Sequence, residues 1–146
     1  MTTQPRYTSK QYRDYLAGDS GLPIAGTVAR YVIPFPPSVN GAYRLIPVKS
    51  GGVRRVKGKK HAEWEVTAQA CVSIQRQRQP KIAGRYKIAF TFARPKDGHR
   101  HDLGNLEKAP HDVLVRMGVV LDDSLAEEIT LRWGDVNGCQ IQLEAI

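Results

Sequence analysis

The sequence predicts an α+β fold with a mixed sheet of about four strands, a small additional hairpin and two main helices. Apolar and polar residues alternate in several short segments, which is the pattern of half-buried strands. Two longer segments carry apolar residues at helical spacing. The chain has 146 residues, of which 41% are hydrophobic, and this is enough for one domain with a single core.

The first 26 residues are expected to form an arm outside the domain, which then covers residues 27–146. This segment is polar and rich in tyrosine. Ser9 is a candidate cap for a short helix that stops at Gly18. Pro23 and Gly26 mark a linker before the first strand.

The first half of the domain is expected to contain a strand, a hairpin and a helix. The strand covers residues 27–35 and ends in a proline-rich segment that cannot lie in the middle of a sheet. The hairpin covers residues 42–58 around Ser50-Gly51-Gly52, and the helix covers residues 59–78. Residues spaced by four predict the buried stripe of this helix: Ala62, Val66, Ala70 and Ile74, with Cys71 beside them.

The second half is expected to contain a strand, a helix and a terminal hairpin. The strand covers residues 85–94, with Tyr86, Ile88, Phe90 and Phe92 on its inner face. The helix covers roughly residues 105–117, and Pro110 requires either a start near Lys108 or a kink. Gly118 is the expected residue after its end. Two strands around the Asn137-Gly138 turn are expected to pair as the terminal hairpin.

The charge of the chain indicates a polyanionic partner. Lys and Arg number 22 against 14 Asp and Glu, which gives a formal net charge of +8. A basic protein that is merely soluble remains an alternative. No segment has the apolar length of a membrane span or of a signal peptide, so we expect a cytoplasmic protein without a membrane partner. Cys71 and Cys139 form no CxxC pair and therefore predict no zinc site.

A basic run is the first candidate binding feature. Five of the seven residues from Arg54 to Lys60 are cationic, and Arg44 and Lys49 precede them. Such cations neutralise DNA phosphates without reading sequence. The alternative is a solvated surface loop. The predicted DNA-binding residues of this segment are Arg44, Arg54, Arg55, Lys57, Lys59 and Lys60.

Carboxylates on either side of the second helix are the candidate catalytic feature. Asp102 precedes this helix, and Asp122 and Asp123 follow it. A helix of about 12 residues advances ~18 Å, and six extended residues return ~20 Å, so the two ends can meet. Carboxylate oxygens are ligands for Mg²⁺, and a nearby cation such as Lys108 can stabilise phosphate charge. The alternative is a capped helix with a Lys108–Asp112 pair and a turn at Asp122-Asp123.

The segment Asp102-Leu103-Gly104-Asn105-Leu106-Glu107-Lys108, followed by Asp112-Val113-Leu114, Gly118 and Leu121-Asp122-Asp123, resembles the signature of RusA-type Holliday-junction resolvases. The family pattern is Asp-Leu-Asp-Asn-Leu-x-Lys, then Asp-Ala-Leu, Gly and Asp-Asp, with the same spacing over these 22 residues. The segment Pro34-Phe35-Pro36-Pro37-Ser38-Val39-Asn40 is similar to the opening motif of the family. The resemblance covers roughly residues 30–145.

The resemblance implies a homodimeric α+β endodeoxyribonuclease that nicks four-way DNA junctions in symmetric pairs, as in recombination and repair. It implies Mg²⁺ or Mn²⁺ as cofactor and no small-molecule cofactor, in a bacterial or phage-infected cell. By position in the motif, Asp102, Lys108 and Asp123 are the catalytic residues. Asp102, Asp122 and Asp123 are the metal ligands. Asn40 and Asn105 join the predicted DNA-binding residues.

One position departs from the family pattern. Gly104 stands where the family has its second motif aspartate, so the expected site lacks one carboxylate. Asp122, Glu107 or Asp97 could substitute for it. Otherwise the enzyme is weak, or the protein binds junctions without cutting them. A generic basic module for RNA or DNA is the third hypothesis, supported by charge alone.

Overall fold

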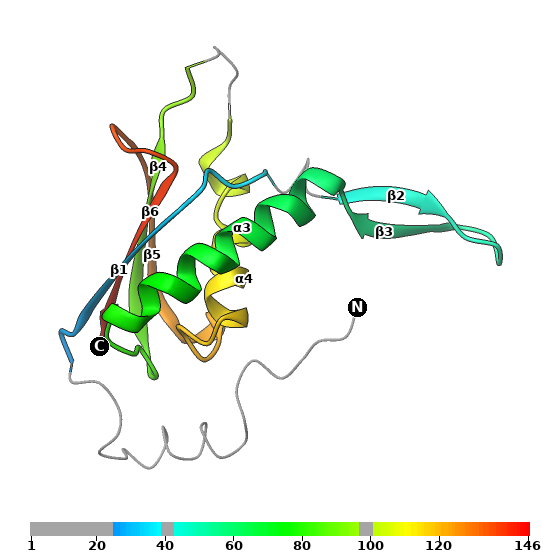
Figure 1. Ribbon diagram of the computed structural model, residues 1–146. Coiled ribbons are helices and arrows are strands. Elements are labelled where there is room, and N and C mark those ends of the chain that lie inside the picture. The colour runs from blue at the N-terminus through cyan, green and yellow to red at the C-terminus, as the bar shows by residue number, and fades with distance from the viewer. Residues whose placement is uncertain (1–24, 39–42, 97–100) are drawn as a thin grey trace.

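A computed structural model of the chain describes residues 25–38, 43–96 and 101–146 (Figure 1). The four-stranded sheet contains β1 (Val28–Ile33), β4 (Tyr86–Ala93), β5 (Ala126–Gly134) and β6 (Cys139–Ala145). A second sheet of two strands contains β2 (Tyr43–Pro47) and β3 (Val53–Lys57). The main helices are α3 (Lys59–Gln75) and α4 (Lys108–Arg116). The predicted α+β class, with two helices, a mixed sheet and a hairpin, is confirmed. The arm helix predicted after Ser9 lies outside the described residues.

The order of strands in the main sheet corrects one expectation. The order is β1-β6-β4-β5, so β4 lies between the two last strands of the chain. The predicted terminal hairpin is therefore wrong, because β5 pairs with β4 in parallel and β6 pairs with β4 in antiparallel fashion. The chain passes from β4 through α4 to β5, a connection that parallel pairing requires. Gly138 has a φ of +66°, a conformation that favours glycine, but the connection it lies in does not join paired strands.

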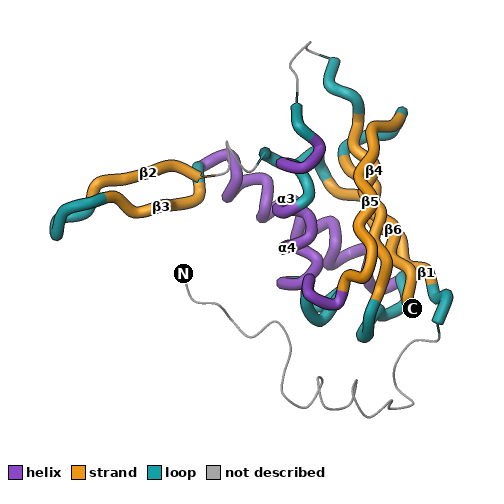
Figure 2. The backbone as a smooth tube through the Cα atoms, turned by 180° about the vertical axis from the view of Figure 1, so that it is seen from behind, coloured by secondary structure: helices purple, strands orange, loops and turns teal. Residues whose placement is uncertain are grey.

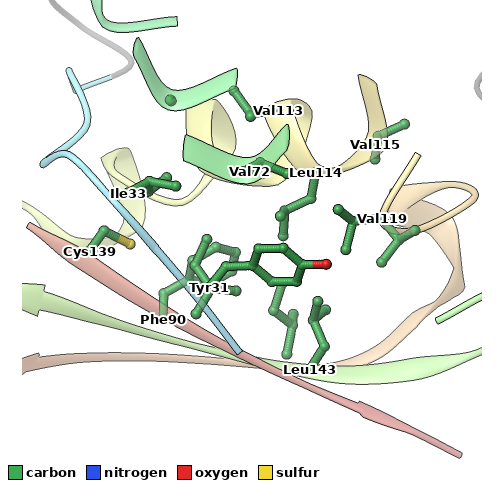
Figure 3. Packing of buried hydrophobic residues seen from close by; sticks show 14 of the residues in the cluster. Tyr31, Ile33, Val72, Phe90, Val113, Leu114, Val115, Val119, Cys139 and Leu143 are labelled. Carbon is green, nitrogen blue, oxygen red and sulfur yellow. The ribbon is translucent and has the colours of Figure 1, made fainter. Parts of the chain in front are cut away.

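Both helices cover the same face of the sheet, as Figures 1 and 2 show. Every second residue of β4 is buried on this face, as predicted from its alternation. Figure 3 shows Val72 from α3 and Leu114 from α4 packed with Phe90 and Tyr31 from the sheet. These side chains form a single continuous core, which fixes both ends of α4 relative to the sheet.

The buried face of α3 is not the predicted one. Val66 and Ile74 are 70% and 69% exposed, and Ala62 and Ala70 are also exposed. The buried residues of α3 are instead His61, Trp64, Glu65, Ala68 and Val72. Two of these are polar, so apolar periodicity could not identify the face. Their burial is supported by partners, because charged groups inside a protein need pairing.

Arg116 of α4 supplies the main partner for the buried face of α3. Its guanidinium forms an ion pair with Glu65, whose side chain is 10% exposed. Gln69 Nε2 donates to Glu65 Oε1 at 3.2 Å, and His61 Nε2 lies 3.5 Å from Glu65 Oε2. The polar cluster joins α3 to the C-terminal end of α4.

Helix α4 begins near Lys108, as the position of Pro110 predicted. A short 3-10 helix, η2 (Leu103–Asn105), precedes α4, which begins at Lys108. Pro110 then lies in the first turn, where its missing N–H costs nothing. Gly118 follows the C-cap residue Met117 with φ of +73°, a conformation that favours glycine. A further 3-10 helix, η3 (Asp123–Leu125), leads into β5.

The two-stranded sheet extends away from the rest of the fold (Figure 1). Its strands pair in antiparallel register from Tyr43 opposite Lys57 to Pro47 opposite Val53. The predicted hairpin around Ser50-Gly51-Gly52 is therefore confirmed, and both glycines have positive φ. None of the described helices is long and apolar enough to cross a membrane.

Candidate active site

The two sequence motifs lie side by side although about 60 residues separate them. The ring of Phe35, just after β1, packs edge-on against His101 with centroids 5.9 Å apart. Phe35 also contacts Phe92 near the end of β4, with centroids 6.2 Å apart. The indole Nε1 of Trp64 donates to the carbonyl of Pro34 at 3.0 Å. These contacts place the proline-rich segment beside the residue that precedes Asp102.

Asp102 is the N-cap residue of the 3-10 helix η2. Its carboxylate oxygen Oδ1 accepts a hydrogen bond from the backbone N–H of Gly104 at 3.2 Å. The backbone N–H of Asn105 donates to the carbonyl of Asp102 at 3.0 Å. The Asp102 side chain is exposed, so its orientation is set by backbone contacts while the carboxylate remains accessible.

The backbone at Gly104 has room for a side chain. A Cβ atom placed there would meet only Asp102 Oδ1, at 3.7 Å, which is an ordinary contact. The backbone φ of Gly104 is not positive, so no special conformation calls for glycine. The missing family carboxylate therefore reflects a change of residue and not a change of fold.

Lys108, the first residue of α4, lies near Asp112 one turn later. Its Nζ is 3.4 Å from both carboxylate oxygens of Asp112. The Lys108 side chain is 53% exposed, so the pair contributes little to stability and leaves the ammonium accessible. This pair is the structural alternative that the spacing also predicted, and it does not prevent the ammonium from meeting a phosphate.

Asp122 and Asp123 lie beyond the other end of α4, where η3 begins. The Asp122 carboxylate accepts from the Ser124 hydroxyl at 2.6 Å, and its carbonyl accepts from the N–H of Leu125 at 3.2 Å. Both aspartates are half-buried. Asp102 and Asp123 thus occupy opposite ends of α4 in sequence, and their convergence on one ion stays a prediction.

A buried chain of hydrogen bonds joins the two ends of α4. The Tyr86 hydroxyl lies 2.6 Å from Nε2 of His111 and 3.2 Å from the carbonyl of Asp122. On the other side of the ring, Nδ1 of His111 lies 2.5 Å from Glu107 Oε1. Tyr86 is fully buried and His111 is 3% exposed. Sequence reasoning missed this chain, although the i,i+4 spacing of Glu107 and His111 was a usable signal.

The described carboxylates offer a metal ion no more than two ligands at any one place. Across residues 25–38, 43–96 and 101–146, no three His, Cys, Asp or Glu side chains are grouped to hold an ion. Mg²⁺ is commonly held by one or two carboxylates, with phosphates and water completing its shell. Oε1 of Glu107 lies 2.5 Å from Nδ1 of His111, so one of its two carboxylate oxygens is engaged, and its substitution for the missing carboxylate at Gly104 stays a prediction. Asp97 lies outside the described residues.

The predicted DNA-binding cations lie on the β2–β3 hairpin and at the start of α3. Arg54, Lys59 and Lys60 are exposed, and the Lys59 side chain is 90% exposed at 4.0 Å from Glu63. Only the backbone of Arg44, Arg55 and Lys57 is described, within β2 and β3. Asn105 is half-buried in η2, whereas Asn40 lies outside the described residues.

Comparison with known proteins adds one finding. A family model described as endodeoxyribonuclease RusA matches residues 34–144, which is most of the chain. The match contains β2 to β5, nearly all of β6, both main helices and every described residue of the candidate site. No curated protein matches the chain.

Proposed function

The chain belongs to the RusA endodeoxyribonuclease family, and from that premise we propose that it is a metal-dependent, structure-specific endonuclease that resolves four-way DNA junctions. The observation that carries the proposal is the accessible carboxylate of Asp102, held by the backbone of η2 within the matched region. A basic hairpin on the same chain supplies the DNA contact that such an enzyme needs.

In this proposal Asp102, Asp122 and Asp123 hold Mg²⁺ or Mn²⁺. When bound, the ion supplies an activated water and stabilises charge on the scissile phosphate. Lys108 contributes a positive charge beside that phosphate. The chain of Tyr86, His111 and Glu107 keeps the segment of Asp122 at a fixed position relative to the start of α4.

DNA binding is assigned to the hairpin and to the asparagines of the two motifs. The exposed side chains of Arg54, Lys59 and Lys60 contact phosphates, which position the protein without reading sequence. Selection of a junction over a duplex then comes from the shape of the branch point. A homodimer gives two copies of the site and so allows paired nicks. The remaining DNA contacts in the proposal are Asn40, Arg44, Arg55, Lys57 and Asn105.

Gly104 favours a second candidate function. The open backbone there carries no carboxylate, and Glu107 is held by His111. A protein with this site could bind junctions while cutting them weakly or not at all. The two candidates share the DNA-binding surface and differ only in the chemistry at η2.

The test is an assay of purified protein on an end-labelled four-way junction and on a duplex of the same sequence. The proposal expects nicks in opposing strands of the junction with Mg²⁺ or Mn²⁺, and none with a chelator. Tight junction binding without nicks in either metal would select the second candidate. Equal affinity for junction and duplex would contradict both and leave a generic basic module.

A further inference from the structure

The main sheet has two edge strands, β1 and β5, and they differ in how many of their outer backbone groups are bonded. An edge strand presents unpaired N–H and C=O groups, which readily pair with a strand of another chain. Proteins therefore cover such an edge or use it for assembly. The contacts of each edge indicate whether it is covered or is available for assembly.

Glutamine side chains cover the edge of β1. The amide of Gln75 accepts from the N–H of Val32 at 2.8 Å and donates to its carbonyl at 2.6 Å. Gln79 Oε1 accepts from the N–H of Arg30 at 2.8 Å. The Gln75 amide thus reproduces the paired bonds that a neighbouring strand would make. Three of the backbone groups that another strand would use on β1 are therefore already bonded to glutamine side chains.

Among the described residues, no side chain bonds to the outer edge of β5 as the glutamines do to β1, although η2 packs against this strand. β5 is nine residues long and pairs only with β4. Its residues 127–130 are all exposed, and Ile129 is 46% exposed although its partner Ile88 in β4 is buried. A long edge with an exposed apolar residue is a surface for pairing with another strand.

The sequence of β5 is complementary to itself in the antiparallel direction. Its register with β4 places Glu128, Thr130 and Arg132 on the face away from the helices, beside Lys87, Ala89 and Thr91. Glu128 lies 3.8 Å from Lys87 within the same chain, and its side chain is 60% exposed, so it remains accessible to a second partner. Ile129 and Leu131 lie on the helix face. A two-fold axis at Thr130 puts Glu128 opposite Arg132 of the second copy, twice, and Ile129 opposite its Leu131. Opposite charges and apolar residues in directly facing positions stabilise strand pairs.

We propose that β5 pairs with β5 of a second copy of this chain, in antiparallel register about Thr130, and joins the two main sheets into one. The inference deepens the proposed function, because it rests on the homodimer included there. A register moved by two residues in either direction loses both Glu128–Arg132 pairs. The axis is perpendicular to the sheet, so α3 and α4 of both copies lie on the same face.

The exposed apolar face of α3 is a weaker surface for a second copy. Val66 and Ile74 are exposed there, but Lys59 and Lys60 lie at one end and Arg76 and Arg78 at the other. Two copies of α3 packed in antiparallel fashion would bring these like charges together. The charges of β5 favour self-pairing, whereas those of α3 oppose it.

Charge-reversal variants test the register. Glu128→Arg and Arg132→Glu are made singly and together, and sedimentation equilibrium gives the dimer Kd at low salt. Each single change turns two attractive pairs into two repulsive ones, so we expect the Kd to rise roughly thirty-fold. The double variant restores the pairs with reversed polarity, and an equimolar mixture of the single variants forms a mixed dimer. Single variants that dimerise like the wild-type chain, or a monomeric wild-type chain, would overturn the inference.

Cysteine cross-linking tests the position of the axis. In a Cys71→Ser background, Thr130→Cys brings two thiols together across the axis, and oxidation should give a covalent dimer. Arg30→Cys on the covered edge of β1 is the matched control and should remain uncrosslinked. Equal cross-linking of both variants would contradict the proposed axis.

The dimer experiments and the nicking assay can fail independently of each other. A chain that forms the β5 dimer but never nicks a junction retains this inference and loses the enzymatic one. A chain that nicks junctions in pairs while the charge variants keep the wild-type Kd loses this inference alone.

Discussion

The hydroxyl of Tyr86 lies 2.6 Å from Nε2 of His111, inside the core and between the two ends of α4. The hydroxyl also reaches the carbonyl of Asp122, and His111 reaches Glu107, the residue before Lys108. One buried hydrogen-bond chain therefore sets the spacing of segments that carry the candidate site residues.

Removing the hydroxyl in Tyr86→Phe leaves a buried nitrogen of His111 and the Asp122 carbonyl without this partner. We expect the free energy of unfolding to fall by about 1–3 kcal/mol, measured by urea denaturation. Tyr31→Phe is the control, because Tyr31 is also buried in the core and lies outside the chain of Tyr86, His111 and Glu107. An equal loss in both variants would show that the hydrogen-bond chain is not what stabilises this region.

Asp102→Asn tests the candidate catalytic carboxylate without disturbing its structural role. Asparagine caps a helix as well as aspartate does, so η2 should keep its start. We expect the rate of junction nicking to fall by roughly a hundred-fold or more, while junction affinity in a gel-shift assay stays within a few-fold of wild type. Asp135→Asn, at an exposed side chain paired with Arg94, is the control and should cut normally. Full nicking by Asp102→Asn would remove Asp102 from the chemistry.

Gly104→Asp restores the carboxylate that the family pattern has at this position. The open space at Gly104 accepts the side chain, and its Cβ lies in ordinary contact with Asp102. Because a metal site gains affinity with each anionic ligand, we expect nicking at limiting Mg²⁺ to rise roughly ten-fold or more. Gly104→Asn adds similar bulk without charge and should leave the rate near wild type. A rate that does not rise in Gly104→Asp would show that this position has no part in the metal site.

Salt dependence tests the role of the basic hairpin and the start of α3. The slope of log K against log salt should become shallower by about 0.9 for each cation that no longer meets a phosphate. The triple variant Arg54→Ala, Lys59→Ala, Lys60→Ala removes three exposed cations, so its slope should fall by nearly three such steps. Lys81→Ala removes an exposed cation between η1 (Arg76–Arg78) and β4, beyond the opposite end of α3, and should not alter the slope. Unchanged slopes in the triple variant would place the DNA elsewhere.

The two cysteines should differ in reactivity. Burial raises the pKa of Cys139 from 9.0 to about 12, and the residue is fully buried. Its thiolate fraction at pH 8 is then about one in ten thousand, so a thiol reagent should titrate only Cys71 in the folded chain and both in urea. The raised pKa also means that the unfolded thiol ionises first, so stability falls as pH rises above 9. Two reactive thiols in the native state would contradict the buried position of Cys139.

The sequence was informative wherever a local rule decides the structure. Alternation predicted β4, Pro110 predicted the late start of α4, and Gly118 predicted its end. The motif spacing predicted the family to which the chain belongs. These features depend on residues within a few positions of one another.

Features that depend on distant partners could not be predicted in the same way. The buried face of α3 contains Glu65 because Arg116, about 50 residues later, pairs with it. The insertion of β4 between β5 and β6 follows from the α4 connection and not from the turn at Asn137-Gly138. The hydrogen-bond chain through His111 needs a hydroxyl from Tyr86, 25 residues away.

The most direct test of the central claim is a crystal structure of the protein with a four-way junction and Mn²⁺, in which anomalous scattering locates the ion. The account predicts a manganese peak bound by carboxylate oxygens of Asp102 and of Asp122 or Asp123, with Lys108 beside the adjacent phosphate. A DNA complex in which manganese is bound away from these carboxylates, or in which Asp102 and Asp123 remain too far apart to share an ion, would contradict it.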